Sequence, residues 1–218
     1  MTPMQDKQTR VEAVMKLAPV IPVVIIDEAR HAVPMARALV AGGIRAIEVT
    51  LRTQAALDAI RAIAAEVEGA VVGVGTVLSG HDLAAAERAG ARFAVSPGAA
   101  PGLLDAADDS ALPLLPGVAT ASEAMILLER GYRHLKFFPA VPAGGVKLLG
   151  AWASPLPQLR FCPTGGIGLA NAPDFLALPN VLCVGGSWLV PPERLAAGDW
   201  AGIEQLAREA SMLRRPHA

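Results

Sequence analysis

The chain contains 218 residues, 53% of them hydrophobic and 18% charged, so it is long enough to bury the core of one α/β domain. Its 19 basic and 20 acidic residues give a formal net charge of -1, and without a basic run a nucleic-acid-binding protein is not expected. The polar amino terminus and the short apolar run over 17–26 favour neither a signal peptide nor a membrane span, so we predict a cytoplasmic protein with no membrane partner.

Short apolar runs alternate with Ala- and Leu-rich stretches along the chain, at a spacing of roughly 20–25 residues. Strands are predicted over 20–26, 46–49, 71–74, 93–95, 112–115, 135–138, 160–162 and 181–184. Helices are predicted between them, including 28–40, 54–66, 80–89, 122–129 and 171–176. This rhythm predicts a closed (β/α)8 TIM barrel, and the amphipathic segment over 7–17 predicts an additional N-terminal helix that caps the barrel.

No linker or low-complexity tract divides the sequence, which predicts a single (β/α)8 domain over 1–218. Within it we expect the N-terminal helix over about 1–18, the barrel strands and helices over 19–190, and a C-terminal helix over 191–218. In such a barrel the reactive groups gather at the carboxyl ends of the strands. Polar residues at those ends are therefore the candidates for chemistry.

The second predicted strand lies in AIEVTLRT, where alternation places Glu48, Thr50 and Arg52 on the face that looks into the barrel. A glutamate in an apolar lumen can accept and return protons, and an arginine at the strand end can bind a carboxylate with two parallel hydrogen bonds. A purely structural Glu48–Arg52 ion pair is the alternative. The third strand ends in VVGVGTV, where small residues leave room in the lumen and Thr76 follows the strand.

The segment HLKFFPA places Lys136 inside an apolar strand, on the same face as His134 and Phe138. Desolvation beside aromatic rings disfavours the ammonium form, and the resulting amine can attack a carbonyl and close to an imine. This is the chemistry of a Schiff-base lysine. The alternatives are a lysine paired with a carboxylate for structure and one whose head group lies in solvent.

The last two predicted strands run into FCPTGGIG and CVGGSWLV, so two neighbouring turns each carry a glycine pair before an expected helix start. Backbone amides in such turns can bind phosphate, and the predicted cradle consists of Gly165, Gly166, Gly185, Gly186 and Ser187. Two ordinary tight turns are the alternative.

The cysteines Cys162 and Cys183 lie in apolar runs and are expected to be buried free thiols. The histidines His31, His81 and His217 fall on predicted helices or the tail, and His134 has no ligand partner at a fitting spacing. No metal site is predicted.

The segments EVTLRT, GVGTVL, AVSPG, KFFPA, GGVK, RFCPTGG and VLCVGGSWLVP resemble the family of 2-keto-3-deoxy-6-phosphogluconate (KDPG) and 4-hydroxy-2-oxoglutarate (KHG) aldolases. By this resemblance Lys136 is the Schiff-base lysine and Glu48 the general acid/base, while Arg52 and Thr76 hold the pyruvyl carboxylate and its neighbouring oxygen. The resemblance also implies that Pro97, Phe138 and Thr164 line the substrate pocket and that the glycine turns with Ser187 receive the distal phosphate. The sequence departs from the family pattern at Ala119, where relatives often carry serine, and in the loop AVPAGG.

The resemblance implies a class I aldolase, a lyase that cleaves KDPG to pyruvate and glyceraldehyde 3-phosphate in the Entner–Doudoroff pathway and that acts on KHG as well. It also implies a homotrimer with neither a metal nor another cofactor. One alternative is an aldolase for 2-keto-3-deoxy-6-phosphogalactonate, and another is a phosphate-binding isomerase or epimerase barrel that forms no imine. A non-catalytic sugar-phosphate sensor is a further alternative.

Overall fold

The computed structural model describes residues 2–213, whose strands all pair in parallel. The strands are β1 (Val20–Val24), β2 (Ala46–Thr50), β3 (Val71–Gly75), β4 (Ala94–Val95), β5 (Leu114–Leu115), β6 (Gly117–Val118), β7 (His134–Phe137), β8 (Arg160–Pro163) and β9 (Val184–Gly186). Nearly all their residues are buried, as expected for strands covered on both faces.

The strands form a six-stranded sheet in the order β5-β4-β3-β2-β1-β9 and a three-stranded sheet in the order β6-β7-β8. The strand predicted over 112–115 contains β5, which pairs with β4, whereas β6 was not predicted and pairs with β7. Pro116 separates β5 from β6, and having no N–H it cannot donate to a ladder. At the other edges, single bridges join Phe161 to Val181 and Thr164 to Gly185.

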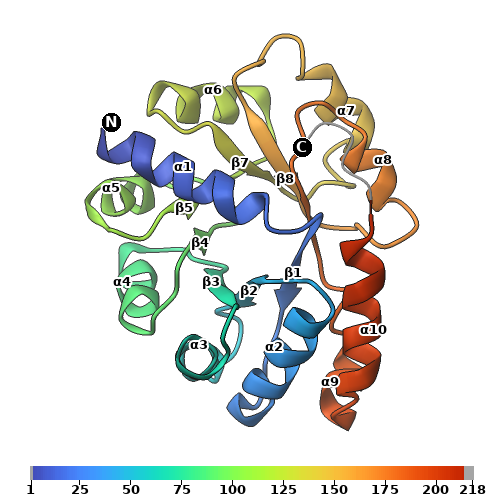
Figure 1. The fold of residues 1–218 in the computed structure, drawn as a ribbon. Helices are drawn as coiled ribbons and strands as arrows, with labels where there is room; N and C mark the ends of the chain where they lie inside the picture. The colour runs from blue at the N-terminus through green and yellow to red at the C-terminus, as the bar shows by residue number, and fades with distance from the viewer. Residues whose placement is uncertain (1, 214–218) are drawn as a thin grey trace.

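Helices surround the strands in Figure 1, so the fold is an α/β fold built on a curved parallel sheet. They are α1 (Pro3–Met15), the 3-10 helix η1 (Ala29–His31), α2 (Ala32–Ala41), α3 (Ala56–Glu66), α4 (Gly80–Arg88), α5 (Pro101–Asp109), α6 (Ala121–Glu129), α7 (Gly145–Ala151), α8 (Ala172–Leu176), α9 (Pro192–Ala197) and α10 (Trp200–Ser211). Among residues 2–213, no helix has the length and apolar character needed to cross a membrane.

Side-chain caps fix where several helices begin. The Ser79 hydroxyl accepts from the Asp82 amide and the Asp82 carboxylate accepts from the Ser79 amide, which starts α4 with a capping box. Thr120 and Glu123 do the same for α6. The amide of Ala119, donating to Glu123 Oε2 at 2.7 Å, lowers the pKa of that carboxyl below its ordinary value.

Two clusters of buried apolar side chains hold the fold together. The larger one lies between the sheet and the surrounding helices, and the smaller one lies on the other face of the strands. The smaller cluster includes Phe93 and Cys162 from the strand region together with Val11, Val14 and Met15 from α1. The apolar face of α1 therefore covers side chains that several strands direct to a common interior.

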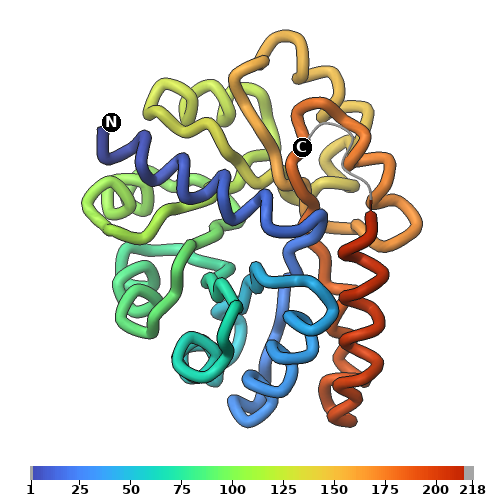
Figure 2. Tube along the Cα trace, viewed as in Figure 1, coloured from blue at the N-terminus to red at the C-terminus, as the bar shows by residue number. Residues whose placement is uncertain are grey.

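The helices α2 and α10, which are far apart in the sequence, pack against each other and run side by side in Figure 2. A side chain at Gly42, just after α2, would meet Ala207 Cβ at 2.5 Å and the backbone of Glu204 at 2.6 Å. Glycine is therefore required for this close approach of the two segments.

The predicted elements agree with the structure in kind and differ in their bounds. The strand predicted over 20–26 ends at Val24, and the one predicted over 181–184 forms later, as β9, so that Gly185 and Gly186 pair with β1 rather than form a turn. A single C-terminal helix over 191–218 is wrong, because Gly198 adopts a left-handed φ of 65° that separates α9 from α10. Residues 214–218 of that segment lie outside the described residues.

Candidate functional site

Lys136 and Glu48 form the centre of the candidate site. Lys136 projects from β7 and Glu48 from β2, and the Lys136 Nζ atom donates to Glu48 Oε1 at 3.2 Å. Lys136 is 5% exposed and Glu48 3% exposed, so water is nearly excluded from the pair. The Phe138 ring lies 5.3 Å from Nζ, measured to its centroid, where it favours a nearby cation.

Next to Lys136, the turn that contains Pro97 packs against Gly117. Gly117 in β6 is the register partner of Lys136, and a side chain there would meet the Pro97 backbone at 2.4 Å. The turn itself is held by Ser96, fully buried, whose hydroxyl donates to the Gly98 carbonyl at 2.7 Å. No role for Ser96 is predicted from the sequence. The signal for one was its place beside Pro97 at a strand end.

Arg52 and Thr76 meet where β2 and β3 end. Arg52 Nε donates to Thr76 Oγ1 at 3.3 Å. Thr76 has a φ of 59°, which a β-branched residue rarely adopts and which is typical of functional strand ends. Among the ion pairs of residues 2–213 there is none between Glu48 and Arg52, so the structural pair considered from the sequence is not formed.

Thr164 and Gly185 face each other across the bridge between β8 and β9. A side chain at Gly185 would lie 2.2 Å from Thr164 Oγ1, so the glycine makes room for the threonine hydroxyl. The neighbouring Gly186 is covered by the ring of Trp188, within 1.7 Å of where a Cβ would be. Ser187 follows directly after β9.

Gly165 and Gly166 follow β8 with φ values of 103° and 75°, a backbone shape that favours glycine. The Gly165 carbonyl accepts from the Val141 amide at 3.0 Å, and the Asn171 amide group donates to the Gly166 carbonyl at 3.1 Å. The helix predicted over 171–176 is observed as α8 from Ala172, and the helix predicted from 191 begins as α9 at Pro192, so a loop separates each glycine pair from its helix. The loop between β8 and α8 is held in place by these hydrogen bonds of Gly165 and Gly166.

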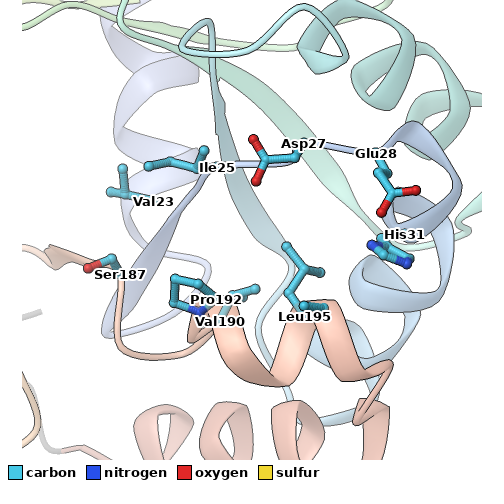
Figure 3. A pocket seen from close by; sticks show the side chains of 10 residues that line it. Val23, Ile25, Asp27, Glu28, His31, Ser187, Val190, Pro192 and Leu195 are labelled. Carbon is cyan, nitrogen blue, oxygen red and sulfur yellow. The ribbon is translucent and has the colours of Figure 1, made fainter.

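A pocket of about 420 Å³ opens beside the end of β1 (Figure 3). Val23, the register partner of Glu48, lies at one end of it together with Ser187, and Asp27, Glu28 and His31 line it farther along the chain after β1. The remaining lining is apolar and comes from Ile25, Val190, Pro192, Leu195 and Ala196. Val23 was not singled out from the sequence, because the segment over 20–26 is apolar at every position.

His134 lies outside this site. Its Nδ1 is 3.2 Å from Gln8 Oε1 of α1, and burial lowers its pKa to about 4, against the weaker opposing effect of Glu12. Among residues 2–213, no group of three or more His, Cys, Asp or Glu side chains is placed to hold a metal ion. Cys162 and Cys183 are buried and are not joined in a disulfide, as expected, and His217 lies outside the described residues.

Comparisons with known proteins agree along almost the whole chain. A family model described as KDPG and KHG aldolase matches residues 11–206. The KHG/KDPG aldolase of Escherichia coli (strain K12) is 55% identical over 207 residues, which cover 95% of this chain and 97% of the relative.

Solved structures give the same result. A crystal structure of 2-keto-3-deoxy-6-phosphogluconate aldolase from Zymomonas mobilis superposes with a TM-score of 0.91 at 49% identity, covering 95% of this chain and 99% of that one. A KDPG aldolase structure from Legionella pneumophila, with pyruvate captured as a covalent carbinolamine intermediate, gives a TM-score of 0.90 at 45% identity. That comparison covers 97% of this chain and 98% of the other.

Proposed function

The chain belongs to the KDPG and KHG aldolase family, and from that premise we propose that it is a class I aldolase that cleaves KDPG to pyruvate and glyceraldehyde 3-phosphate and also acts on KHG. The observation that carries this proposal is the buried contact of 3.2 Å between Lys136 Nζ and Glu48 Oε1. A desolvated amine beside a carboxylate can act as nucleophile with an adjacent acid/base. The covalent carbinolamine of the Legionella relative supports the same chemistry.

Imine formation begins when Glu48 takes a proton from Lys136, leaving a neutral amine and a carboxylic acid within hydrogen-bond distance. The amine attacks the C2 carbonyl of the substrate to give a carbinolamine. Glu48 then returns the proton to the departing hydroxyl, water leaves, and an iminium forms on Lys136. No metal or other cofactor takes part in this proposal.

The iminium then accepts the electrons of the C3–C4 bond. Glu48, now a carboxylate, accepts the C4 hydroxyl proton as that bond breaks, which releases glyceraldehyde 3-phosphate and leaves an enamine on Lys136. Glu48 donates a proton to C3 of the enamine, which restores the iminium, and water hydrolyses it to pyruvate and the free lysine. Each proton removed is returned, so Glu48 ends in its starting state.

The other predicted site residues hold the substrate in this proposal. Arg52 and Thr76, joined by their own hydrogen bond, bind the pyruvyl carboxylate and the adjacent oxygen. Pro97, Phe138 and Thr164 line the substrate-binding space around Lys136 in this proposal. The distal phosphate is received by Gly165, Gly166, Gly185, Gly186 and Ser187.

The wider architecture is proposed on the same basis. Only Pro116 separates β5 from β6, and isolated bridges join the segments around β8 and β9, which supports one closed (β/α)8 barrel. In this proposal α1 caps the amino-terminal mouth of the barrel, and the chain forms a single domain. A homotrimer and a cytoplasmic location follow from the family resemblance. Light scattering after gel filtration tests the trimer directly.

A coupled assay of pyruvate release tests the function. The wild-type protein is expected to release pyruvate faster from KDPG than from the galactonate isomer, and to be active with KHG. Lys136→Met and Glu48→Gln are expected to lose activity by about a hundredfold or more. Wild-type protein that releases no pyruvate from any of these acids would overturn the proposal.

A further inference from the structure

The Glu48 carboxylate rests on a residue that has no side chain. A Cβ atom added at Gly75 in β3 would lie 2.2 Å from Glu48 Oε1, 2.7 Å from Cγ and 2.8 Å from Cδ. Real Cβ atoms do not approach other atoms so closely, and the φ of Gly75 is not in the positive range, so alanine would be excluded by Glu48 and not by the backbone. The notch at Gly75 is therefore shaped to the carboxylate.

The atom that fills this notch is also the atom that contacts the lysine. Glu48 Oε1 accepts from Lys136 Nζ at 3.2 Å, so anything that displaces Oε1 alters that contact. The neighbouring notch is occupied, since a Cβ at Gly73 would lie 2.4 to 2.5 Å from atoms of the Phe93 ring. Because the Phe93 ring fills the space at Gly73, the register partner of Glu48, and Glu48 is only 3% exposed, the carboxylate has little room to shift and still contact Lys136.

We infer that Gly75 is a positioning residue for the proposed aldolase reaction: the space left by its absent side chain holds the Glu48 carboxylate against Lys136. This inference rests on the proposed function for its kinetic consequence. Its steric basis stands independently, because the fit between Gly75 and Glu48 is a property of packing. The expected lesion in Gly75→Ala is thus in proton transfer by Glu48, with the lysine itself left in place.

Hydrogen exchange at the pyruvate methyl group measures that proton transfer. In D2O, the imine of pyruvate loses a C3 proton to Glu48 and the enamine regains a deuteron, which proton NMR follows. Gly75→Ala is expected to slow this exchange by about tenfold or more. The extent of borohydride trapping at saturating pyruvate should stay at the wild-type level, and Gly75→Ala should slow exchange no further in a Glu48→Gln background.

A double-mutant cycle measured by Tm distinguishes a clash with the Glu48 carboxylate from a general packing defect at Gly75. Glu48→Ala removes the three atoms that the new methyl would meet, so Gly75→Ala should cost stability in the wild type and nothing further in the Glu48→Ala background. Gly73→Ala is the matched control, because its methyl meets Phe93 and its cost should be the same in both backgrounds.

Either of two results would overturn the inference. One is wild-type exchange in folded Gly75→Ala protein, and the other is an equal loss of Tm from Gly75→Ala with and without the Glu48 side chain. The proposed function fails in a different way, through wild-type protein that neither traps pyruvate nor exchanges its methyl protons. In that case the Tm cycle still tests whether Gly75 fits Glu48.

Discussion

The Lys136 and Glu48 side chains are charged groups placed where water barely reaches them, at 5% and 3% exposure. Removing two ions from water costs free energy that their attraction only partly returns, so a buried ion pair is weak evidence for a stabilising role. If these two positions served stability alone, apolar residues there would make the folded protein at least as stable. The pair is better explained by covalent and proton-transfer chemistry.

Arg52 differs from this pair because it is exposed and its Nε atom contacts the Thr76 hydroxyl. We expect Arg52→Lys to raise the KM for KDPG by roughly tenfold or more and to change kcat by less than about threefold, because an ammonium cannot bind a carboxylate through two parallel N–H groups. Steady-state kinetics of pyruvate release measure both constants.

Arg61→Lys provides a matched control, since Arg61 lies on the outer helix α3 and pairs with Asp58. It should leave both constants unchanged. A fall in kcat of Arg52→Lys with KM unaltered would mean that Arg52 acts in the chemical step rather than in binding.

At this scale the sequence predicts which side chains share a face and not how closely they fit. Period-two alternation directed Glu48 into the barrel and placed Lys136 on one face with Phe138, and the structure brings Lys136 and Glu48 to 3.2 Å. Alternation carries no information about distances between strands that are far apart in sequence. The support given to Pro97 by Gly117, and to Glu48 by Gly75, therefore emerged only from the structure.

Among the secondary-structure elements, α1 is held by polar contacts to α5 and to the start of β7. Lys7 is nearly buried and its Nζ donates to the carbonyls of Ala107 and Asp108 at 2.7 and 2.8 Å, in the last turn of α5. Gln8 Oε1 accepts from the amides of Arg133 and His134 at the start of β7. A cation at the carboxyl end of a helix also interacts favourably with its dipole.

We expect Lys7→Met to lower the free energy of unfolding by roughly 1–3 kcal/mol, because the apolar stem is retained while two hydrogen bonds from a charged donor are lost. Chemical denaturation measures the change. Lys147→Met, at an exposed position on α7, should change stability by less than about 0.5 kcal/mol. An equal effect of the two substitutions would contradict this role for Lys7.

The elements were predictable where they are long and periodic, such as α3 and α4, whose observed bounds lie close to those expected. No bounds were predicted for α5 or α7. The helix α7 has only seven residues, two of them glycine, whereas α5 is as long as α4 and was missed without a structural reason. The strand predicted over 112–115 contains β5, but β6, which lies beyond Pro116 and pairs with β7, was not predicted. Pairing between distant segments is not encoded in local periodicity.

For the molecule as a whole, His134 links stability to pH. Its pKa is lowered to about 4 chiefly by burial, while the nearby Glu12 carboxylate favours the charged form and Arg160 and Lys16 oppose it. The unfolded chain takes up a proton near the ordinary value of 6.5 and the folded chain does so only near 4. Stability from the neutral imidazole is thus complete above about pH 6.5 and is lost as the pH falls from there toward 4.

We expect this loss to reach roughly 3 kcal/mol, so the Tm of the wild-type protein should fall as the pH is lowered from about 7 to about 4.5. His134→Asn removes the titrating ring and should make that fall smaller. His81→Asn is the control, because the His81 side chain is 86% exposed. Scanning calorimetry of the three proteins would contradict the assignment to His134 if their Tm values fell in parallel.

The covalent lysine is the central claim, and trapping its imine tests it most directly. The protein is incubated with pyruvate and sodium borohydride, the intact and peptide masses are measured, and Lys136→Ala is treated in parallel. We predict a reduced pyruvyl adduct on Lys136 in the wild type and none in the variant. An unmodified wild-type protein, or an adduct on a different lysine, would contradict the Schiff-base mechanism and return the isomerase and sensor alternatives to consideration.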